Sequence, residues 1–234
     1  DLPNGRRAGY LVLKDFITQA ETPMRAAFER FRAAGATELI LDLRYNGGGR
    51  IATAAQLAAL VAGVSNNGKV FTQVRYNAQH MGSNRSYDFS GATSPGYSRV
   101  VVLTGPRTCS ASELVVNGLK PYVDVVTVGD DTCGKPFGFS PVESCSTTFS
   151  VVNFESYNSL GQGRYYNGIA ARCGGTDTFT GTLGSATESL TAAALRYLQV
   201  GSCPAPLATA ERAAATRFRS LAAEPGERHG MVAD

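Results

Sequence analysis

The chain has 234 residues, enough for one large domain with a substantial core, and its 43% hydrophobic and 18% charged residues exclude disorder over most of its length. The formal net charge is +3 and no basic run is interleaved with aromatic residues, so nucleic acid is not expected as a partner. No apolar stretch approaches the roughly 20 residues that span a bilayer, and no signal peptide is visible.

Short apolar runs, typical of buried parallel strands, alternate with segments whose apolar residues recur at helical spacing. This alternation, with right-handed crossovers, predicts an α/β core around a mostly parallel sheet. In chain order we expect a strand at 8–13, a helix from 22 to 35, a strand at 39–43, a helix at 51–64, strands at 69–75 and 98–105, a helix at 110–119 and a strand at 123–129.

Three later or longer segments depart from this alternation. Residues 77–98 are polar and without periodicity, and we expect a long surface loop of the kind that often forms a lid. From about residue 136 the pattern changes to two or three antiparallel strands, including residues 147–154. A helix at about 187–198 then closes the domain.

Five cysteines lack the paired short spacings of a zinc site and are many for a reduced cytosolic protein, so we interpret them mainly as disulfide partners. Cys133 and Cys145 are expected on neighbouring strands, where a bridge across a hairpin would join them. Cys173 with Cys203 is the second expected pair, which leaves Cys109 as the odd thiol. A competing pairing joins Cys109 to Cys133 and would tie together two segments with candidate catalytic residues.

The segment LTGPRTCSASE leaves a buried strand and places Ser110 where a helix begins. Unpaired N–H groups and the positive end of the helix dipole favour negative charge there, as a serine nucleophile requires. The alternative is that Ser110 only caps the helix, with Glu113 completing a capping box. Ser112 is a rival nucleophile, but from inside the helix it would point elsewhere.

The base that would activate such a serine has few candidates. The only histidines are His80, in the expected loop, and His229, near the end of the chain, and there is no GxSxG motif. A lysine can serve if burial lowers its pKa, and Lys135 lies in TCGKPFGF among apolar residues. The alternative is an ordinary exposed lysine in a turn.

Two glycine-containing segments could bind an anion. The run Gly47 to Gly49 follows a buried strand and precedes a helix, so its amides either face an anion or form a simple tight turn. The segment GDDTCGKP matches a phosphate-binding loop as far as the lysine, but Pro136 replaces the hydroxyl residue that would bind magnesium. We treat this match as chance and expect neither a metal nor another cofactor.

Together, the segments LILDLRYNGGG, TCSASELVVNGL and GKPFGF resemble the carboxyl-terminal processing peptidases, also called tail-specific proteases, which are related to the tricorn core. The motifs occur in the family's order, and their serine and lysine are 25 residues apart, as in the family's usual dyad. The resemblance implies a crotonase/ClpP-like layered α/β fold with a mostly parallel central sheet and an added antiparallel part. We expect the catalytic domain at 1–205 and a helical and polar tail at 206–234.

The resemblance also implies a reaction and a site. Ser110 would be the nucleophile and Lys135 the general base of a serine endopeptidase that works through an acyl-enzyme. The N–H of Ala111 and one from Gly48 or Gly49 would form the oxyanion hole. Polypeptides would be the substrates, and envelope proteins are expected among them because the cysteine-bearing motifs resemble bacterial envelope and lipoprotein members. A secreted or cell-envelope location follows.

Two departures from the family pattern bear on this expectation. Many members carry a glutamine four residues after the lysine, where this chain has Phe139, which with Asn46 is a candidate substrate-contacting residue. Members commonly have a PDZ module that captures the substrate's carboxyl terminus, and we expect it upstream of this chain. The alternatives to a peptidase are a non-catalytic module of the same fold that binds peptides or apolar ligands, and an inactive homologue.

Overall fold

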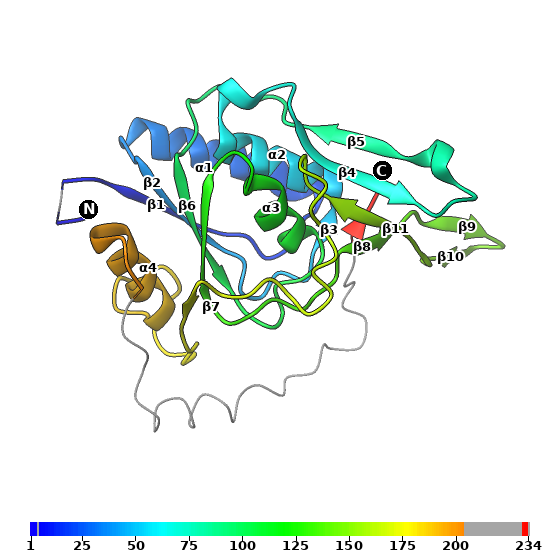
Figure 1. Ribbon diagram of the computed structural model, residues 1–234. Helices are drawn as coiled ribbons and strands as arrows, with labels where there is room; N and C mark the ends of the chain where they lie inside the picture. Colours follow the sequence, from blue (N-terminus) through cyan, green and yellow to red (C-terminus); the bar gives the residue numbers. More distant parts are fainter. Residues whose placement is uncertain (4, 204–230, 234) are drawn as a thin grey trace.

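The chain folds into four layers of secondary structure (Figure 1). The computed structural model describes residues 1–3, 5–203 and 231–233. Helix α4 covers one face of a five-stranded sheet, and helices α1, α2 and α3 cover its other face. A second, six-stranded sheet packs on the far side of α2 and α3, so these two helices lie in the middle of the molecule.

The five-stranded sheet consists of the short apolar runs that the sequence predicts as buried strands. Its strand order is β1-β2-β6-β7-β12, and every neighbouring pair is parallel. Side chains of β2 alternate between two cores, because Leu39 and Leu41 face the three helices while Ile40 faces α4. The strands are β1 Ala8–Val12, β2 Glu38–Asp42, β6 Arg99–Thr104, β7 Asp124–Gly129 and β12 Cys173–Gly174.

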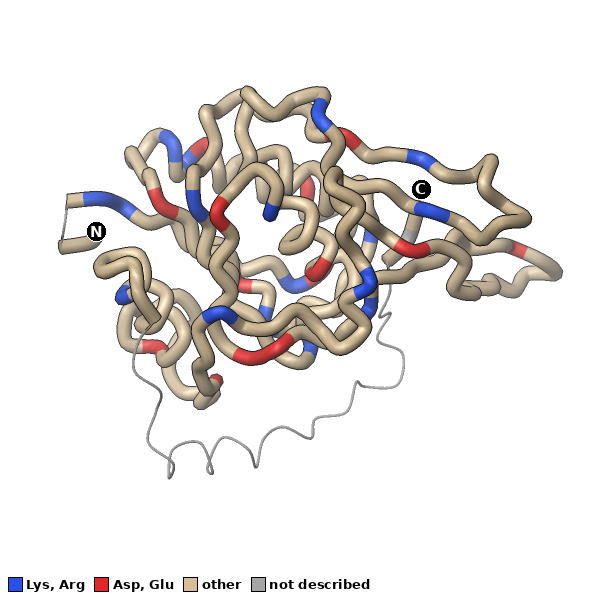
Figure 2. The backbone as a smooth tube through the Cα atoms, viewed as in Figure 1, with Lys and Arg blue, Asp and Glu red and all other residues tan. Residues whose placement is uncertain are grey.

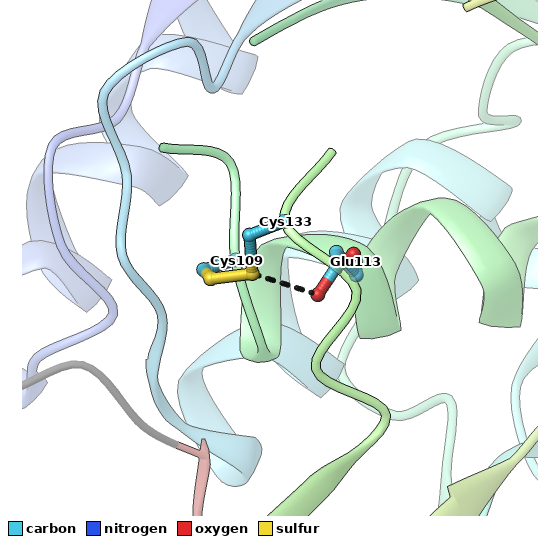
Figure 3. Close-up of side chains that lie close together, drawn as sticks. All are labelled: Cys109, Glu113 and Cys133. Carbon is cyan, nitrogen blue, oxygen red and sulfur yellow. Dashed lines mark hydrogen bonds between the residues drawn. A yellow bond between two sulfur atoms is a disulfide. The ribbon is translucent and has the colours of Figure 1, made fainter. Parts of the chain in front are cut away.

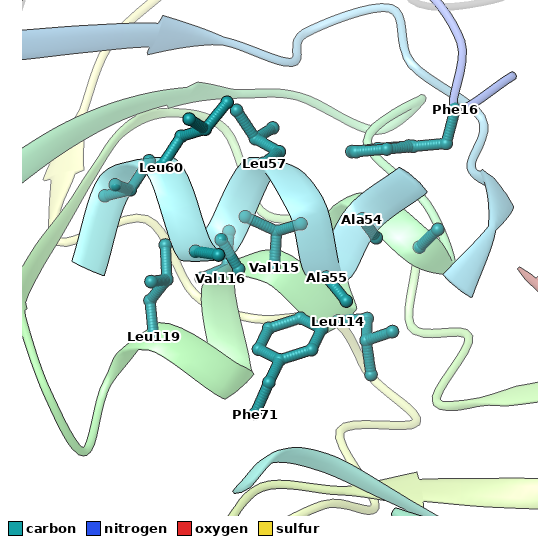
Figure 4. Close-up of a cluster of buried hydrophobic side chains, with 14 of the residues drawn as sticks. Phe16, Ala54, Ala55, Leu57, Leu60, Phe71, Leu114, Val115, Val116 and Leu119 are labelled. Carbon is teal, nitrogen blue, oxygen red and sulfur yellow. The ribbon is translucent and has the colours of Figure 1, made fainter. Parts of the chain in front are cut away.

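Small side chains allow α2 and α3 to pack closely at the centre of the larger core (Figure 4). Ala54 and Ala55 of α2 lie in this cluster with Val115 of α3. Gly118 of α3 packs on Phe71, whose ring lies 2.4 Å from where a β-carbon would be, so a larger residue would push the helix off the second sheet. The helices are α1 Glu21–Ala33, α2 Ile51–Ala62, α3 Ala111–Leu119 and α4 Ser189–Val200.

The six-stranded sheet has the order β3-β13-β8-β11-β4-β5. Strand β13 pairs in parallel with both of its neighbours, and the remaining pairs are antiparallel. The strands are β3 Gly49–Arg50, β13 Met231–Val232, β8 Phe137–Phe139, β11 Val152–Tyr157, β4 Val70–Tyr76 and β5 Arg85–Asp88. A separate antiparallel hairpin joins β9 Val142–Ser144 to β10 Thr147–Phe149, and short 3-10 helices lie at η1 Thr18–Ala20, η2 Val64–Asn66 and η3 Met81–Ser83.

The expected α/β fold, with a parallel sheet and an antiparallel part, is confirmed, and two of the expected elements need correction. The long loop expected at 77–98 contains strand β5, which pairs with β4, and Phe89 after it is fully buried. The strand expected at 147–154 is divided between β10 and β11. In the expected tail, residues 206–230 and 234 lie outside the described residues, but Met231–Val232 form a strand of the larger sheet.

Charged residues are spread over most elements, with Lys and Arg interspersed among Asp and Glu (Figure 2). Within the described ranges, no helix has the length and apolar character needed to cross a membrane.

Candidate active site

Ser110 occupies the turn between strand β6 and helix α3, in a backbone conformation that few residues other than glycine adopt (φ 59°, ψ −112°). Its side chain is fully buried. The hydroxyl faces the N–H of Glu113, as in a capping box, but Oγ makes no hydrogen bond of normal geometry with any described residue. A buried hydroxyl held in a strained turn without a structural partner is unusual, and nucleophiles are a common reason for it.

Glu113 is the residue that joins the two predicted catalytic segments. Its buried carboxylate accepts hydrogen bonds from the backbone N–H of Ser110 (2.8 Å), Gly134 (2.8 Å) and Lys135 (2.9 Å) and from the Thr132 hydroxyl (2.5 Å). Four donors satisfy a buried charge that would otherwise be costly. The sequence suggested only a capping box for Glu113, because nothing in its spacing indicates the contacts with residues 132–135.

Lys135 lies in the connection between β7 and β8 and is half-buried. Burial lowers the pKa of its amine, and the nearby Glu113 carboxylate opposes that shift. The pKa of Lys135 is therefore shifted downward by burial, which is the direction that a lysine base requires. Because Ser110 Oγ has no hydrogen-bond partner, Ser110 and Lys135 are not hydrogen-bonded to each other through this atom in this structure.

The glycine turn packs directly against the serine. Gly48 has φ +117°, and a β-carbon there would lie 2.9 Å from Ser110 Cβ and 3.1 Å from the nitrogen of Ala111. Only glycine allows this approach. The turn therefore lies beside Ala111, whose N–H belongs to the first, unpaired group of helix donors. The N–H of Gly48 donates to Asn46 Oδ1 (2.9 Å), and Gly49 begins strand β3.

Asn46 is fully buried and fixes the glycine turn, so it does not reach outward to a substrate as the sequence suggested. Its side chain bonds Leu13 O (2.9 Å) as well as the Gly48 N–H. Its backbone oxygen accepts from the Cys109 N–H (3.1 Å) and from Ser112 Oγ (3.0 Å). The hydroxyl of Ser112, the rival nucleophile, is thus engaged in holding α3 to the turn.

A buried charge network anchors the start of the same turn. Arg44 bonds Asp42 through Nη2 (2.7 Å) and Glu188 through Nη1 (2.8 Å), and all three side chains are almost completely buried. The Arg44 charge and hydrogen bonds from Thr191 lower the pKa of Glu188 to about 2, against the opposing effect of burial. This network ties the end of β2 to the start of α4, and sequence spacing did not indicate it.

The cysteine pairing differs in part from expectation (Figure 3). The structure joins Cys109 to Cys133 and Cys173 to Cys203, with Cα–Cα distances of 5.3 and 5.2 Å. The expected Cys133–Cys145 bridge is wrong, because Cys145 lies at the tip of the β9–β10 hairpin while Cys133 precedes β8. Cys145, not Cys109, is the exposed free thiol.

The remaining candidate residues contribute less to the site. The donor atoms of Cys109, Glu113 and Cys133 lie within 4.8 Å of one another, but sulfurs joined in a disulfide are not the thiolates that bind a metal. Phe139 is a half-buried residue of β8 opposite Val152 and offers no amide that could orient Lys135. His80 is exposed beside η3, and His229 lies outside the described residues.

The family model for peptidase family S41 matches residues 7–170. The chain therefore belongs to peptidase family S41. The match contains the glycine turn, the serine turn and the lysine segment, in agreement with the resemblance drawn from those motifs.

Individual relatives agree with this assignment. The chain is 29% identical over 135 residues to a carboxyl-terminal-processing protease of Picosynechococcus sp., and 30% identical over 135 residues to the chloroplastic carboxyl-terminal-processing peptidase 2 of Arabidopsis thaliana. These matches cover 58% and 56% of this chain but only 31% and 24% of the relatives, so the chain spans about a third or less of the length of each.

Solved structures confirm the fold. A Bacteroides fragilis protein described as an S41 protease superposes with a TM-score of 0.79 at 28% identity, covering 85% of this chain and 56% of that one. The photosystem II D1 C-terminal processing protease superposes with a TM-score of 0.58 at 24% identity, covering 73% of this chain and 43% of that one.

Proposed function

We propose that this chain is the catalytic domain of a serine endopeptidase in which Ser110 is the nucleophile and Lys135 the general base. The observation that carries the proposal is the state of the Ser110 hydroxyl, which is buried in a strained turn and makes no structural hydrogen bond. The turn of Gly48 and the N–H of Ala111 lie next to it. Glu113 holds the lysine segment to the same turn.

In the proposed reaction, the neutral amine of Lys135 takes the proton of Ser110 as Oγ attacks the peptide carbonyl carbon. The oxyanion accepts hydrogen bonds from the Ala111 N–H and from the glycine turn, where the Gly48 N–H would have to exchange its bond to Asn46 for one to the substrate. Lys135 then gives its proton to the leaving amine. Water hydrolyses the acyl-enzyme in a second step, with Lys135 again as the base.

The absence of a hydrogen bond from Ser110 Oγ to Lys135 is compatible with this reaction, because catalytic hydrogen bonds are often loose until substrate binds. The same observation favours the second candidate, an inactive homologue of this fold that binds peptides or apolar ligands. Phe139 in place of the usual glutamine also favours it.

We infer further that the natural substrates are envelope or secreted proteins, which the family resemblance implies. Two disulfides support an oxidising location for the chain. Recognition of a substrate tail would then fall to a PDZ module, as the resemblance implies. Cleavage of one peptide with a free and with an amidated carboxyl terminus tests whether residues 1–234 distinguish tails on their own, and equal rates are expected.

A serine-reactive fluorophosphonate probe tests the proposed dyad. Labelling of the wild-type chain should be lost in Ser110→Ala and should fall about a hundredfold or more in Lys135→Ala, because an unactivated serine is a weak nucleophile. Lys120→Ala is the matched control, since burial also lowers the pKa of Lys120 but this residue lies at the opposite end of α3 from Ser110. Equal labelling of all four proteins, or none of the wild type, would contradict the proposal.

A further inference from the structure

A disulfide links the two segments that carry the proposed catalytic residues. Cys109 directly precedes Ser110, and Cys133 lies two residues before Lys135. The bond (Figure 3) therefore fixes the turn before α3 to the connection before β8, as the hydrogen bonds from Ser110 and Lys135 to Glu113 also do. The other disulfide, Cys173–Cys203, packs with α4 on the opposite face of the parallel sheet.

The two cysteines of the Cys109–Cys133 bond differ in exposure. Cys133 is exposed, whereas Cys109 is half-buried beneath the serine turn. Thiol–disulfide exchange requires a thiolate to approach one sulfur directly. An external dithiol can therefore reach this bond at Cys133, and Cys109 is the sulfur that leaves.

Reduction would change the hydrogen bonding of the residue that organises the site. Cys133 Sγ lies 3.5 Å from Glu113 Oε2 and has no proton to donate while it is in the disulfide. The reduced thiol can donate, and a thiolate there is disfavoured because it would face the carboxylate. The same oxygen, Oε2, accepts from the N–H of Ser110 and of Lys135, so the new donor competes with both.

We propose that the Cys109–Cys133 disulfide is a site of thiol–disulfide exchange, at which a dithiol reductant reversibly lowers the activity of the adjacent Ser110 and Lys135. The effect on activity rests on the peptidase function proposed above. One thiolate of the reductant attacks Cys133 Sγ, a mixed disulfide forms, and Cys109 leaves and takes up a proton. The second thiolate of the reductant then attacks the reductant's first sulfur in the mixed disulfide. This forms the cyclic disulfide of the reductant and releases Cys133, which takes up a proton. The protein gains two electrons and two protons, and the dithiol becomes a disulfide.

The fold should survive this reduction, because other contacts hold the same segments together. The Cys133 N–H donates to Thr108 O (3.1 Å), and Glu113 still accepts from Gly134 and Thr132 through its other oxygen, Oε1. Reduction should therefore lower activity by displacing Ser110 and Lys135 slightly and not by unfolding the chain. A misplacement of about 1 Å in an active site can reduce a rate about a hundredfold, and we expect a reduction of about tenfold here, since most contacts remain.

The test treats the oxidised chain with dithiothreitol and follows two readouts. Alkylation of the released thiols followed by mass spectrometry shows which disulfide has opened, and the rate of fluorophosphonate labelling reports the site. We expect the labelling rate to fall about tenfold as Cys109 and Cys133 become alkylated, and to return on reoxidation. The far-ultraviolet circular dichroism should not change.

Paired variants provide the control. Cys173→Ser with Cys203→Ser should keep the response to dithiothreitol, because that disulfide lies away from the site. Cys109→Ser with Cys133→Ser should label slowly and should not respond. If the Cys109→Ser, Cys133→Ser variant does not fold, the Cys173→Ser, Cys203→Ser variant still tests the proposal, because its labelling rate should fall reversibly on reduction of Cys109–Cys133.

The outcomes separate this proposal from the one on which it rests. Failure of the oxidised wild type to label would overturn the peptidase function. Normal labelling that does not change when Cys109 and Cys133 are shown to be reduced would overturn the redox proposal alone, as would a rise in labelling. A Cys109–Cys133 bond that resists dithiothreitol in the folded chain would overturn it as well.

Discussion

The two halves of the candidate site are held in place by different means. The serine turn lies between a buried strand and a buried helix, and the glycine turn packs against it with no space for a β-carbon at Gly48. The lysine lies in a connection without regular structure, held by the carboxylate of Glu113 and by a disulfide. Close packing therefore adds to the hydrogen bonds and the disulfide that hold the nucleophile, whereas the base depends mainly on polar and covalent bonds.

This difference predicts that steric changes damage the serine half and that electrostatic changes damage the lysine half. Core packing tolerates few changes in volume, so its effects should be large and independent of pH. Hydrogen bonds to a charged group are individually weaker and respond to protonation.

The largest effect is expected for Gly48→Ala. The new methyl group would lie 2.9 Å from Ser110 Cβ and would displace the nucleophile, reducing the labelling rate by about a hundredfold or more. Gly35→Ala is the control, because Gly35 also has a positive φ but no atom lies within 4 Å of the added carbon. Both variants should lose about 1 kcal/mol of stability from backbone strain, and Gly48→Ala should lose about 1 to 3 kcal/mol more from the contact with the serine turn. Equal labelling of the two variants would mean that contact between the turns does not matter.

A smaller effect is expected for Glu113→Gln. The amide keeps one acceptor oxygen, but its NH2 group would face the N–H donors that the carboxylate now satisfies. We expect the labelling rate to fall about tenfold and the free energy of unfolding to fall by about 2 kcal/mol, measured by urea denaturation. Thr132→Val removes a single hydrogen-bond donor to Glu113. It should therefore reduce both the labelling rate and the free energy of unfolding by less than Glu113→Gln does. The reverse order would contradict the central position given to Glu113.

The pH dependence of labelling should separate the two halves further. Because the neutral amine is the competent base, the rate should rise with pH and level off at the pKa of Lys135, which burial places below the ordinary lysine value of 10.5. Glu113 raises that pKa, so Glu113→Gln should move the profile to lower pH, whereas Gly48→Ala should lower the rate without moving it. A wild-type rate that is constant from about pH 5 to about pH 9 would contradict the role of Lys135.

The smallest effect on activity is expected for Glu188→Gln, which acts on stability through Arg44. The folded-state pKa of Glu188 is about 2, below its ordinary value of 4.5, so its contribution is present above pH 4.5 and is lost as the pH falls toward 2. The shift corresponds to about 3 kcal/mol, to order of magnitude. Urea denaturation at several pH values should show this loss in the wild type and a weaker loss in Glu188→Gln. Labelling at neutral pH should change by about twofold or less, because Glu188 touches Arg44 and not the turn itself.

The sequence predicted most of the parallel sheet and its helices, since continuous apolar runs and helical spacing are local signals. It missed β5 because a short exposed strand paired with β4 leaves little apolar pattern. It also gave no sign of strand β13, whose residues Met231 and Val232 pair with strands from the first two thirds of the chain. Pairing between distant segments depends on the whole fold and not on the local pattern.

At the site, the motifs indicated which residues lie there more successfully than they indicated the role of each residue. Glu113 appeared as half of a capping box and Asn46 as a substrate contact, although both satisfy backbone groups from segments far along the chain. The partner of Cys133 was uncertain for the same reason, because spacing suggested that Cys133 and Cys145 lie on neighbouring strands, whereas Cys145 lies at the tip of the β9–β10 hairpin and Cys133 precedes β8. Such roles depend on three-dimensional neighbours, which no spacing rule supplies.

Strand β13 has a consequence for the assembly of the molecule during synthesis. Strands β3 and β8, which continue directly from the glycine turn and from the lysine segment, are not neighbours in the sheet, and Met231 lies between them. A nascent chain that has not yet reached residue 231 already contains every proposed catalytic residue but lacks the strand that sets the spacing between these two edges. The ribosome must therefore release the chain up to residue 232 before this sheet can close, so its completion follows the synthesis of all the proposed catalytic residues.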